Sequence, residues 1–310
     1  MPDIVISEFM DEAAVGELSQ RHSTFYDPLL VDRPDALAGQ LATARALIVR
    51  NRTNVDGALL AAAPRLACVG RLGVGLDNID VDACRQRGIA VFPATGANDL
   101  SVAEYVITAA LLLLRRAWFA TDAVVAGHWP RQQLIGREAS GKTLGLIGFG
   151  SIGRETARRS AALGMSVVAF DPFVPQSDAA WKLARHVEWD ELLAKADVVS
   201  LHVPLTPETR RLIDAAALAA MKPGAILINA ARGGIVEEAA LADALASGRL
   251  SGAALDVFES EPLSAEAGAR FAGLPNLILT PHIAGVTKES NIRVSRATAH
   301  SVLRHLERLG

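Results

Sequence analysis

The feature that most constrains this chain is a glycine-rich turn between two apolar runs, within residues 143–171. The run at residues 144–147 predicts a buried strand, and residues 154–163 have the pattern of a helix. A second apolar run at residues 167–170 predicts another strand, which ends at Asp171. Strand, turn, helix, strand and acid in this order are typical of a dinucleotide-binding unit, whereas a G-x-G-x-x-G turn alone also occurs in ordinary loops. The glycines of the turn are Gly148, Gly150 and Gly153.

Each residue type in this unit has a physical reason. Gly148 allows a tight turn, Gly150 lets the backbone approach a pyrophosphate, and Gly153 lets the helix pack close to the strand. The N-terminus of the helix presents N–H groups and a positive dipole end to the phosphates. Asp171 can accept hydrogen bonds from both ribose hydroxyls of NAD and would repel the 2′-phosphate of NADP, and no arginine directly follows it. We therefore expect NAD as the cofactor.

Short apolar runs alternate with helical patterns over nearly the whole chain, which is typical of parallel α/β sheets. The 310 residues suffice for two domains, and only the second half contains the phosphate-binding turn. We expect an α/β protein of two doubly wound parallel-sheet domains with a cleft between them. These are a flavodoxin-like substrate domain, residues 1–97 plus 284–310, and a Rossmann NAD-binding domain, residues 98–283. The expected strands are residues 4–6, 46–49, 66–69, 89–92, 144–147, 167–170, 198–201, 225–229, 252–256 and 277–280.

Two long helical patterns accompany this division. One begins at Asn98 or Ser101, extends to about Trp118 and is more apolar than a single amphipathic stripe. We expect this helix to be buried between the domains or against a second subunit. The other covers residues 287–309, has basic residues on its open face, and is expected to pack back on the first domain.

Composition excludes several classes of function. The formal net charge of −3 gives no electrostatic reason to bind nucleic acid or an anionic membrane. The N-terminal residues are too acidic for a secretion signal, and the most apolar segment, residues 102–114, is too short to span a bilayer. Because Cys68 and Cys84 are the only cysteines, we expect no metal cluster, no disulfide framework and a cytoplasmic location.

Three charged residues follow expected strands in the second half of the chain, namely Arg232, Glu261 and His282. Ligands of open parallel sheets bind outside the carboxyl ends of the strands, so these side chains could converge beside the nicotinamide ring. The set suits hydride transfer between NAD and a 2-hydroxy acid. The guanidinium can grip the carboxylate with two hydrogen bonds, and the imidazole can take and return the hydroxyl proton. A glutamate bonded to the other ring nitrogen would fix its tautomer and favour the protonated ring.

Each of these residues also has a plain structural interpretation. An arginine after a strand is more often a surface or ion-pair residue, and a histidine after Thr-Pro can be a loop residue with satisfied hydrogen bonds. The chain has six other histidines, and most are expected to have no role in the site. His202 follows an expected strand and either lines the cofactor site or has no role there.

Over nearly its whole length the chain resembles the D-isomer-specific 2-hydroxyacid dehydrogenases. The motifs that carry the resemblance are G-F-G-S-I-G at residues 148–153, H-V-P-L-T at 202–206, N-A-A-R-G-G at 229–234, D-V-F-E-S-E-P at 256–262 and T-P-H-I-A-G at 280–285. The resemblance implies that Arg232, Glu261 and His282 are the catalytic residues. It also implies a homodimer, with a tetramer left open, in which the long helix helps to form the interface.

The resemblance bears on the cofactor site and on one related activity. Formate dehydrogenases of this superfamily carry glutamine as the partner of the histidine, so Glu261 argues against that activity. The expected NAD contacts are Gly148, Gly150, Ser151, Ile152, Gly153, Asp171, His202, Val203, Pro204, Ala230, Ala231, Asp256 and Gly285.

The segment G-R-L-G-V-G-L-D-N-I-D at residues 70–80 is similar to the substrate loop of the phosphoglycerate dehydrogenase branch. The similarity implies that backbone N–H groups of residues 72–74 bind the substrate carboxylate together with Arg232. Arg71 is then left for a second anion on the substrate, unless it pairs with Asp77 or a helix C-terminus. The expected substrate-binding residues are Arg71, Leu72, Gly73, Val74, Asn98, Arg232 and His282.

The chain departs from phosphoglycerate dehydrogenases in two respects. We expect no regulatory domain after the last helix, and residues 95–99 are T-G-A-N-D in place of the more usual P-N-G-N-S. We therefore expect an NAD-dependent dehydrogenase for a small 2-hydroxy acid with a second anionic group, of the 3-sulfolactate or 3-phosphoglycerate type. The alternatives are a glyoxylate or hydroxypyruvate reductase and, outside enzymes, an NAD-sensing protein similar to transcriptional corepressors.

Overall fold

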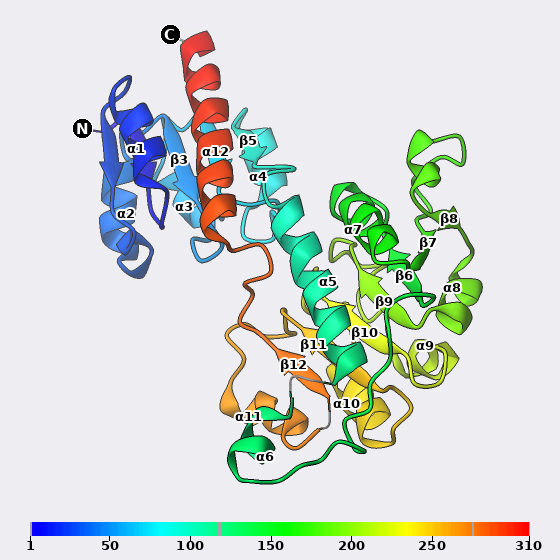
Figure 1. Ribbon diagram of the computed structural model, residues 1–310. Helices are drawn as coiled ribbons and strands as arrows, with labels where there is room; N and C mark the ends of the chain where they lie inside the picture. The colour runs from blue at the N-terminus through cyan, green and yellow to red at the C-terminus, as the bar shows by residue number, and fades with distance from the viewer. Residues whose placement is uncertain (1, 117–118, 275, 310) are drawn as a thin grey trace. The chain divides into compact units, whose positions relative to one another are not determined.

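A computed structural model describes all residues except 1, 117–118, 275 and 310 (Figure 1). The expected end of the long helix at Trp118 therefore lies outside the described residues. None of the described helices combines the length and the apolar character that crossing a membrane requires.

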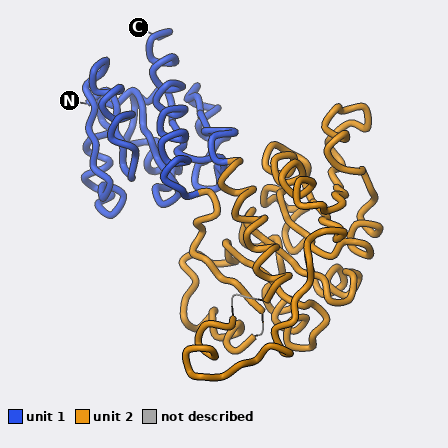
Figure 2. The backbone as a smooth tube through the Cα atoms, in the orientation of Figure 1, with its two compact units in different colours: residues 1–98, 286–310 blue, residues 99–285 orange. Residues whose placement is uncertain are grey.

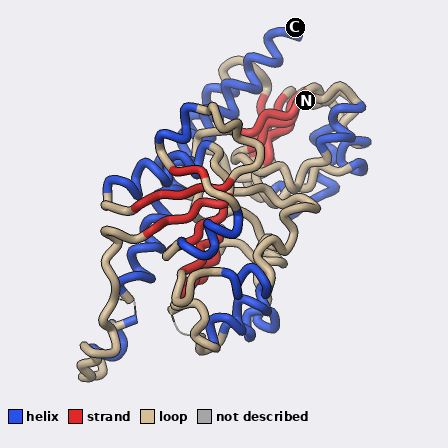
Figure 3. Tube along the Cα trace, turned by 90° about the vertical axis from the view of Figure 1, so that its right-hand side faces the viewer, coloured by secondary structure: helices blue, strands red, loops and turns tan. Residues whose placement is uncertain are grey.

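The chain divides into two compact units, each built on one parallel sheet (Figure 2). Unit 1 contains residues 1–98 and 286–310, and unit 2 contains residues 99–285. These boundaries lie one or two residues from the expected ones. In both units, strands lie side by side with helices packed around them (Figure 3).

Unit 1 has a five-stranded parallel sheet in the order β2-β1-β3-β4-β5, with helices on both faces. Its order reverses between β1 and β3, which are neighbours although β2 lies between them in the chain. Successive side chains along each strand point to opposite faces of the sheet, so both faces carry side chains that the helices can cover. The strands are β1 (Ile4–Ile6), β2 (Thr24–Tyr26), β3 (Ala46–Val49), β4 (Cys68–Arg71) and β5 (Ala90–Pro93). The helices are α1 (Glu12–Ser19), α2 (Pro34–Leu41), α3 (Gly57–Ala61), α4 (Val81–Gln86) and α12 (Lys288–Leu309), with a 3₁₀ turn at Leu30–Asp32.

The last helix, α12, belongs to the core of unit 1, as expected. Its residues Val302 and Leu306 share one buried cluster with strand residues of β1, β3 and β4, on the face that α1 also covers. Helices α2, α3 and α4 cover the opposite face. The helix can lie close to β4 because Gly70 has no side chain, since a Cβ there would lie 2.7 Å from a methyl carbon of Thr298.

Unit 2 has a seven-stranded parallel sheet in the order β12-β11-β10-β9-β6-β7-β8. Helices α5 and α7 cover one face, and α8, α9 and α10 cover the other. The strand order reverses between β6 and β9, which makes this edge the expected ligand site of a doubly wound sheet. The strands are β6 (Thr143–Ile147), β7 (Ser166–Phe170), β8 (Arg185–His186), β9 (Val198–Leu201), β10 (Ile226–Asn229), β11 (Gly252–Leu255) and β12 (Leu277–Leu279). The helices are α5 (Asp99–Arg115), α6 (Thr121–Val125), α7 (Ser151–Ala162), α8 (Trp189–Lys195), α9 (Ala215–Ala220), α10 (Glu238–Ala246) and α11 (Ala265–Gly268), with 3₁₀ turns at Ala179–Lys182 and Ala269–Phe271.

The structure corrects three local expectations. Strands β2 and β8 were not expected, because both are short, lie at sheet edges and lack a buried apolar run. Strand β4 extends to Arg71, so this arginine ends a strand instead of standing inside the following loop. Helix α7 begins at Ser151, directly after Gly150, three residues earlier than expected.

Candidate active site

The glycine turn lies between β6 and α7, at the edge where the strand order of unit 2 reverses. Gly148 has a φ of +93°, and a Cβ there would lie 2.5 Å from the carbonyl oxygen of His202. A Cβ at Gly153 would lie 2.6 Å from the carbonyl oxygen of Gly148. Gly150, in contrast, has no atom within 4 Å of its would-be Cβ. The first and third glycines therefore close the turn, and the second faces open space, as the predicted approach of a pyrophosphate requires.

Two further observations fit a dinucleotide at this turn. Gly150 precedes helix α7 as its N-cap and has no side chain, so the first N–H groups of the helix are not engaged by a capping side chain. The Asp171 carboxylate lies beside the turn, since its Oδ2 accepts a hydrogen bond from the N–H of Phe149 at 2.7 Å. Its Oδ1 accepts from the N–H of Phe173 at 2.9 Å. A carboxylate has further acceptor capacity for ribose hydroxyls.

His202 follows β9 and packs against the glycine turn through its backbone. Burial lowers the pKa of His202 to about 4, so the ring is neutral at neutral pH. One ring nitrogen, Nε2, lies 3.0 Å from the hydroxyl oxygen of Ser200. His202 can therefore shape this edge and form hydrogen bonds there, but it does not supply a positive charge for phosphates.

The structure brings Glu261 and His282 together at the carboxyl edge of three adjacent strands, β10, β11 and β12. His282 Nδ1 lies 2.7 Å from Glu261 Oε2, and Glu261 Oε1 accepts from the N–H of Phe258 at 3.0 Å. Burial raises the pKa of Glu261, but the hydrogen bonds from His282 and Phe258 and the nearby positive charges outweigh burial. The pKa of Glu261 is lowered as a result, so the carboxylate stays ionised beside the imidazole.

Arg232 lies near enough to this pair for its positive charge to contribute to the lowered pKa of Glu261. The Asn229 side chain shapes the turn before it, accepting from the N–H of Ala231 at 3.1 Å and donating to the carbonyl oxygen of Arg232 at 2.9 Å. After the arginine, a Cβ at Gly233 would lie only 1.7 Å from the carbonyl oxygen of Phe258. The glycine thus lets the Arg232 turn pack directly on the loop that carries Glu261.

His282 has a φ of +56°, a conformation that non-glycine residues rarely adopt, and Asp256 stabilises it. The Asp256 side chain is fully buried and accepts from Thr280 Oγ1 at 2.6 Å and from the N–H groups of Ile283 and Ala284 at 2.8 and 2.7 Å. Its carbonyl oxygen accepts from the N–H of His282 at 2.8 Å. Burial raises the pKa of Asp256, although these hydrogen bonds oppose the rise. Asp256 therefore positions His282, and its expected contact with NAD stays a prediction.

Residues that sequence reasoning missed support these loops. The Tyr105 hydroxyl lies 2.6 Å from Thr280 Oγ1 and extends the network from Asp256 to helix α5. Burial raises the pKa of Tyr105 to about 12, so the phenol remains protonated. Glu238 is buried and accepts from the N–H of Glu259 at 2.6 Å, which holds the loop before Glu261. Thr280 directly follows β12, and a polar residue at the end of a strand is a signal for a side chain that supports the next loop. Nothing in the local sequence marks Tyr105 or Glu238 for that role.

In unit 1, Arg71 lies against the loop that follows it. Its Nε donates to the carbonyl oxygen of Gly75 at 2.8 Å, and its Nη1 donates to that of Leu72 at 2.7 Å. Gly73, at φ +152°, leaves room for this side chain, because a Cβ there would lie 2.1 Å from Arg71 Nη1. The guanidinium therefore shapes the expected substrate loop through these two bonds.

Arg50 is a second cation at the carboxyl edge of this sheet, and sequence reasoning missed it. It directly follows β3, where the strand order reverses, and its Nη2 donates to Asn291 Oδ1 at 2.7 Å. Burial lowers the pKa of Arg50, but a guanidinium stays charged at neutral pH. The buried Glu8 carboxylate orders this loop by accepting from the N–H groups of Arg50 at 2.8 Å, Arg52 at 3.1 Å and Thr53 at 3.0 Å. An arginine directly after a strand at a reversal point is the signal that could have identified Arg50.

The remaining expected site residues lie at the ends of elements. Asn98 precedes α5, and its Oδ1 is buried without a hydrogen-bond partner among the described residues, as an atom awaiting a ligand or water would be. Contacts of these residues with NAD or substrate stay predictions. Ser151 and Ile152 begin α7, Val203 and Pro204 follow β9, Ala230 and Ala231 follow β10, Leu72 and Val74 follow β4, and Gly285 ends unit 2.

Comparisons with known proteins identify the family to which the chain is similar. Residues 107–284 match the NAD binding domain of D-isomer specific 2-hydroxyacid dehydrogenases. An (S)-sulfolactate dehydrogenase of Chromohalobacter salexigens is 59% identical over 307 residues, which are 99% of this chain and 99% of that protein. A D-3-phosphoglycerate dehydrogenase of Mycobacterium leprae is 42% identical over 97% of this chain, which spans 56% of that protein's length. Among solved structures, a D-lactate dehydrogenase of Aquifex aeolicus complexed with NAD and lactic acid has a TM-score of 0.85 at 30% identity, covering 98% of this chain and 95% of that one.

Proposed function

The chain belongs to the D-isomer specific 2-hydroxyacid dehydrogenases, and from that premise we propose that it oxidises 3-sulfolactate, or reduces the corresponding keto acid. The family itself confirms several expectations, namely the NAD cofactor, the dehydrogenase activity on 2-hydroxy acids and the fold of two parallel α/β sheets. The observation that carries the proposed chemistry is the 2.7 Å contact between His282 and Glu261, with Arg232 beside them.

We propose that His282 is the general acid and base of the reaction. Glu261 holds Nδ1, so Nε2 is the ring nitrogen that takes the proton of the substrate hydroxyl during oxidation and returns it during reduction. NAD supplies the hydride acceptor when it is bound. Arg232 binds the substrate carboxylate with its planar guanidinium, and the ionised Glu261 stabilises the imidazolium that forms.

The second anion of the substrate requires a further cation, and unit 1 offers Arg71 and Arg50 at the carboxyl edge of its sheet. A sulfonate carries one negative charge where a phosphate carries nearly two, so it needs fewer positive partners. The stereochemistry of the relatives is consistent with one binding geometry. In sulfolactate the sulfur-bearing carbon outranks the carboxylate in naming priority, so the S isomer has the same spatial arrangement as D-3-phosphoglycerate.

A panel of 2-hydroxy acids with NAD tests this proposal through the rate of NADH formation. We expect kcat/KM to be highest for (S)-3-sulfolactate, followed by D-3-phosphoglycerate, with D-glycerate and D-lactate far below. A preference for glycerate, and for glyoxylate or hydroxypyruvate in the reverse direction, would instead support the reductase alternative. Such a result would leave the dehydrogenase chemistry in place. It would overturn only the proposal that the substrate carries a second anionic group.

Three matched variants separate the cations. Arg50→Met and Arg71→Met should each lower kcat/KM on 3-sulfolactate by about tenfold or more, since a charge-assisted hydrogen bond contributes about 1.5–3 kcal/mol. Activity on D-glycerate should change less. Arg52→Met serves as the control. It removes an equal charge from the loop that also carries Arg50, but the Arg52 side chain pairs with Asp32 at the surface. An equal loss on both substrates would show that the arginines serve the fold and not selectivity.

We also propose that the protein is a cytoplasmic homodimer. The segment 119–135 exposes large apolar side chains, among them Val125 at 83%, Trp129 at 75% and Ile135 at 67% exposure, which a second subunit could cover. Light scattering should give twice the chain mass, and Trp129→Asp should shift the protein toward the monomer.

Cys68 and Cys84 are both buried free thiols, which suits the reducing compartment that we propose for the protein.

A further inference from the structure

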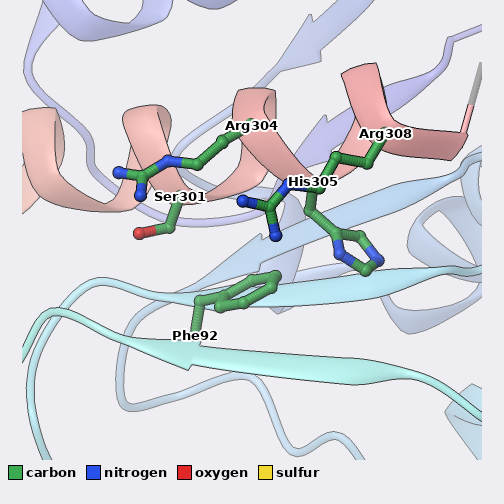
Figure 4. A pocket seen from close by; sticks show the side chains of 5 residues that line it. All are labelled: Phe92, Ser301, Arg304, His305 and Arg308. Carbon is green, nitrogen blue, oxygen red and sulfur yellow. The ribbon is translucent and has the colours of Figure 1, made fainter.

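A cavity of about 250 Å³ lies in unit 1 between strand β5 and the last turns of helix α12 (Figure 4). Phe92 comes from β5, and the other lining residues come from one side of α12. All of these residues belong to unit 1, and none of them is among the expected catalytic, cofactor-binding or substrate-binding residues. The lining residues are Phe92, Ser301, Arg304, His305 and Arg308.

Every polar side chain that lines the cavity can donate hydrogen bonds, and none is a carboxylate. The guanidinium groups of Arg304 and Arg308 are donors only, and the Ser301 hydroxyl and the His305 imidazole can donate as well. No ion pair joins Arg304 or Arg308 to a carboxylate within the part of the chain that the structure describes. The neighbouring Glu307 is engaged elsewhere, with Arg21 at 2.6 Å.

The positive groups are also close to one another. Arg304 and Arg308 stand four residues apart on the helix, a spacing at which like charges repel. Arg304 Nη2 also donates a hydrogen bond to His300 Nε2 at 3.3 Å, which holds this guanidinium along the helix. Figure 4 shows the Arg304, Arg308 and Ser301 side chains extending along the helix above the Phe92 ring. The His305 ring stands edge-on to Phe92, with centroids 5.2 Å apart and planes at 60°. The Phe92 ring and the clustered hydrogen-bond donors of α12 thus line one cavity.

We propose that this cavity binds a compact oxyanion group, a sulfate, sulfonate or phosphate. Arg304 and Arg308 provide the charge-assisted hydrogen bonds, the Ser301 hydroxyl and the His305 ring provide further donors, and the Phe92 ring closes the floor. The helix dipole explains a cation in the last turn of α12, which is where Arg308 stands. It does not explain why Arg304, a hydroxyl and an imidazole line the same cavity.

Calorimetric titration of the full-length protein, with NADH present, tests this site. The probes are inorganic sulfate, inorganic phosphate and methanesulfonate, at low ionic strength. The double variant Arg304→Gln/Arg308→Gln removes the proposed cations. The control Arg85→Gln/Arg296→Gln removes two exposed arginines that lie outside the cavity, so the net charge changes equally.

We expect at least one of the three anions to bind to the wild type and to the control with equal affinity, and about tenfold or more weakly to the cavity variant. The nuclear magnetic resonance signal of the His305 ring, assigned with His305→Gln, should move during the titration in the first two proteins only. Binding of methanesulfonate alone would assign the site to organic sulfonates, and binding of the inorganic ions alone would assign it to free anions. Equal binding in all three proteins, equal weakening in both variants, no binding, or an unmoved His305 signal would overturn the proposal.

Discussion

The two units place charged side chains at the carboxyl edge of a parallel sheet, but they hold the loops there in different ways. In unit 2 the loops pack backbone against backbone, and glycines make this possible, as Gly148 does against residue 202 and Gly233 against residue 258. In unit 1 the loops are held by charged side chains, since Glu8 and Arg71 bond backbone groups of their neighbours. Buried carboxylates accept from backbone N–H groups in both units, as Asp256 does in unit 2 and Glu8 does in unit 1. The comparison teaches that unit 2 adds direct packing of one loop backbone on another, whereas the 50–53 loop of unit 1 depends on the buried charge of Glu8.

The largest effect is expected in unit 2, where His282→Asn removes the proposed acid and base. The value of kcat should fall by about 10²–10⁴-fold, because proton transfer from the substrate hydroxyl loses its acceptor. NADH affinity, measured by fluorescence titration, should stay within about twofold, because the glycine turn is unchanged. His22→Asn, in unit 1, is the control. Retention of most of the wild-type kcat would refute the role of His282.

A pair of glycine variants tests the steric half of the comparison. The Cβ of Gly233→Ala would meet the carbonyl oxygen of Phe258 at 1.7 Å, so urea denaturation should show a loss of about 1–3 kcal/mol in the free energy of unfolding. Gly150→Ala meets no atom within 4 Å and should unfold as the wild type does, while its NADH dissociation constant rises. If Gly150→Ala were the less stable of the two, the assignment of the open glycine to the cofactor would be wrong.

Glu8→Gln tests the charged half, in unit 1. A carboxamide has one oxygen where the carboxylate accepts from three N–H groups, so at least one buried donor loses its partner. Such a loss lowers the free energy of unfolding by about 1–3 kcal/mol. Because the loop that carries Arg50 loosens, the KM for 3-sulfolactate should rise while NADH affinity stays unchanged. Glu12→Gln, an exposed change on α1, serves as the control. Unchanged KM and stability would show that the 50–53 loop does not need this carboxylate.

The effect that is smallest at neutral pH concerns His202, because it appears only in acid. Its pKa of about 4 in the folded chain lies below the ordinary value of about 6.5, so the unfolded chain binds more protons between these values. Stability is therefore lost as the pH falls from about 6.5 to about 4, by about 1–3 kcal/mol in total. His202→Gln should reduce this loss when urea denaturation is compared at pH 7.5 and 5. Identical pH dependence in both proteins would contradict the assignment.

Much of unit 2 could be predicted because its determinants are local. The glycine spacing, the apolar runs and the acid at the end of β7 are all present within residues 143–171. The meeting of Glu261 and His282 was also predictable, since both follow parallel strands whose ends share one edge.

The parts that could not be predicted depend on contacts between residues far apart in the sequence. Glu8 bonds a loop 42–45 residues away, and Tyr105 reaches Thr280 across 175 residues. Neither contact leaves a local pattern. The edge strands β2 and β8 escaped prediction for another reason, because neither has a continuous buried run, and their pairing with β1 and β7 decides their conformation.

The place of helix α12 in unit 1 has a consequence for synthesis. Unit 2 is one continuous segment, whereas the sheet of unit 1 receives the apolar side chains of α12 on the face that it shares with α1. During translation, therefore, all of unit 2 leaves the ribosome before α12 does. Until then the nascent chain carries a partly uncovered sheet in its N-terminal part, and this interval is when a chaperone has the most apolar surface to bind.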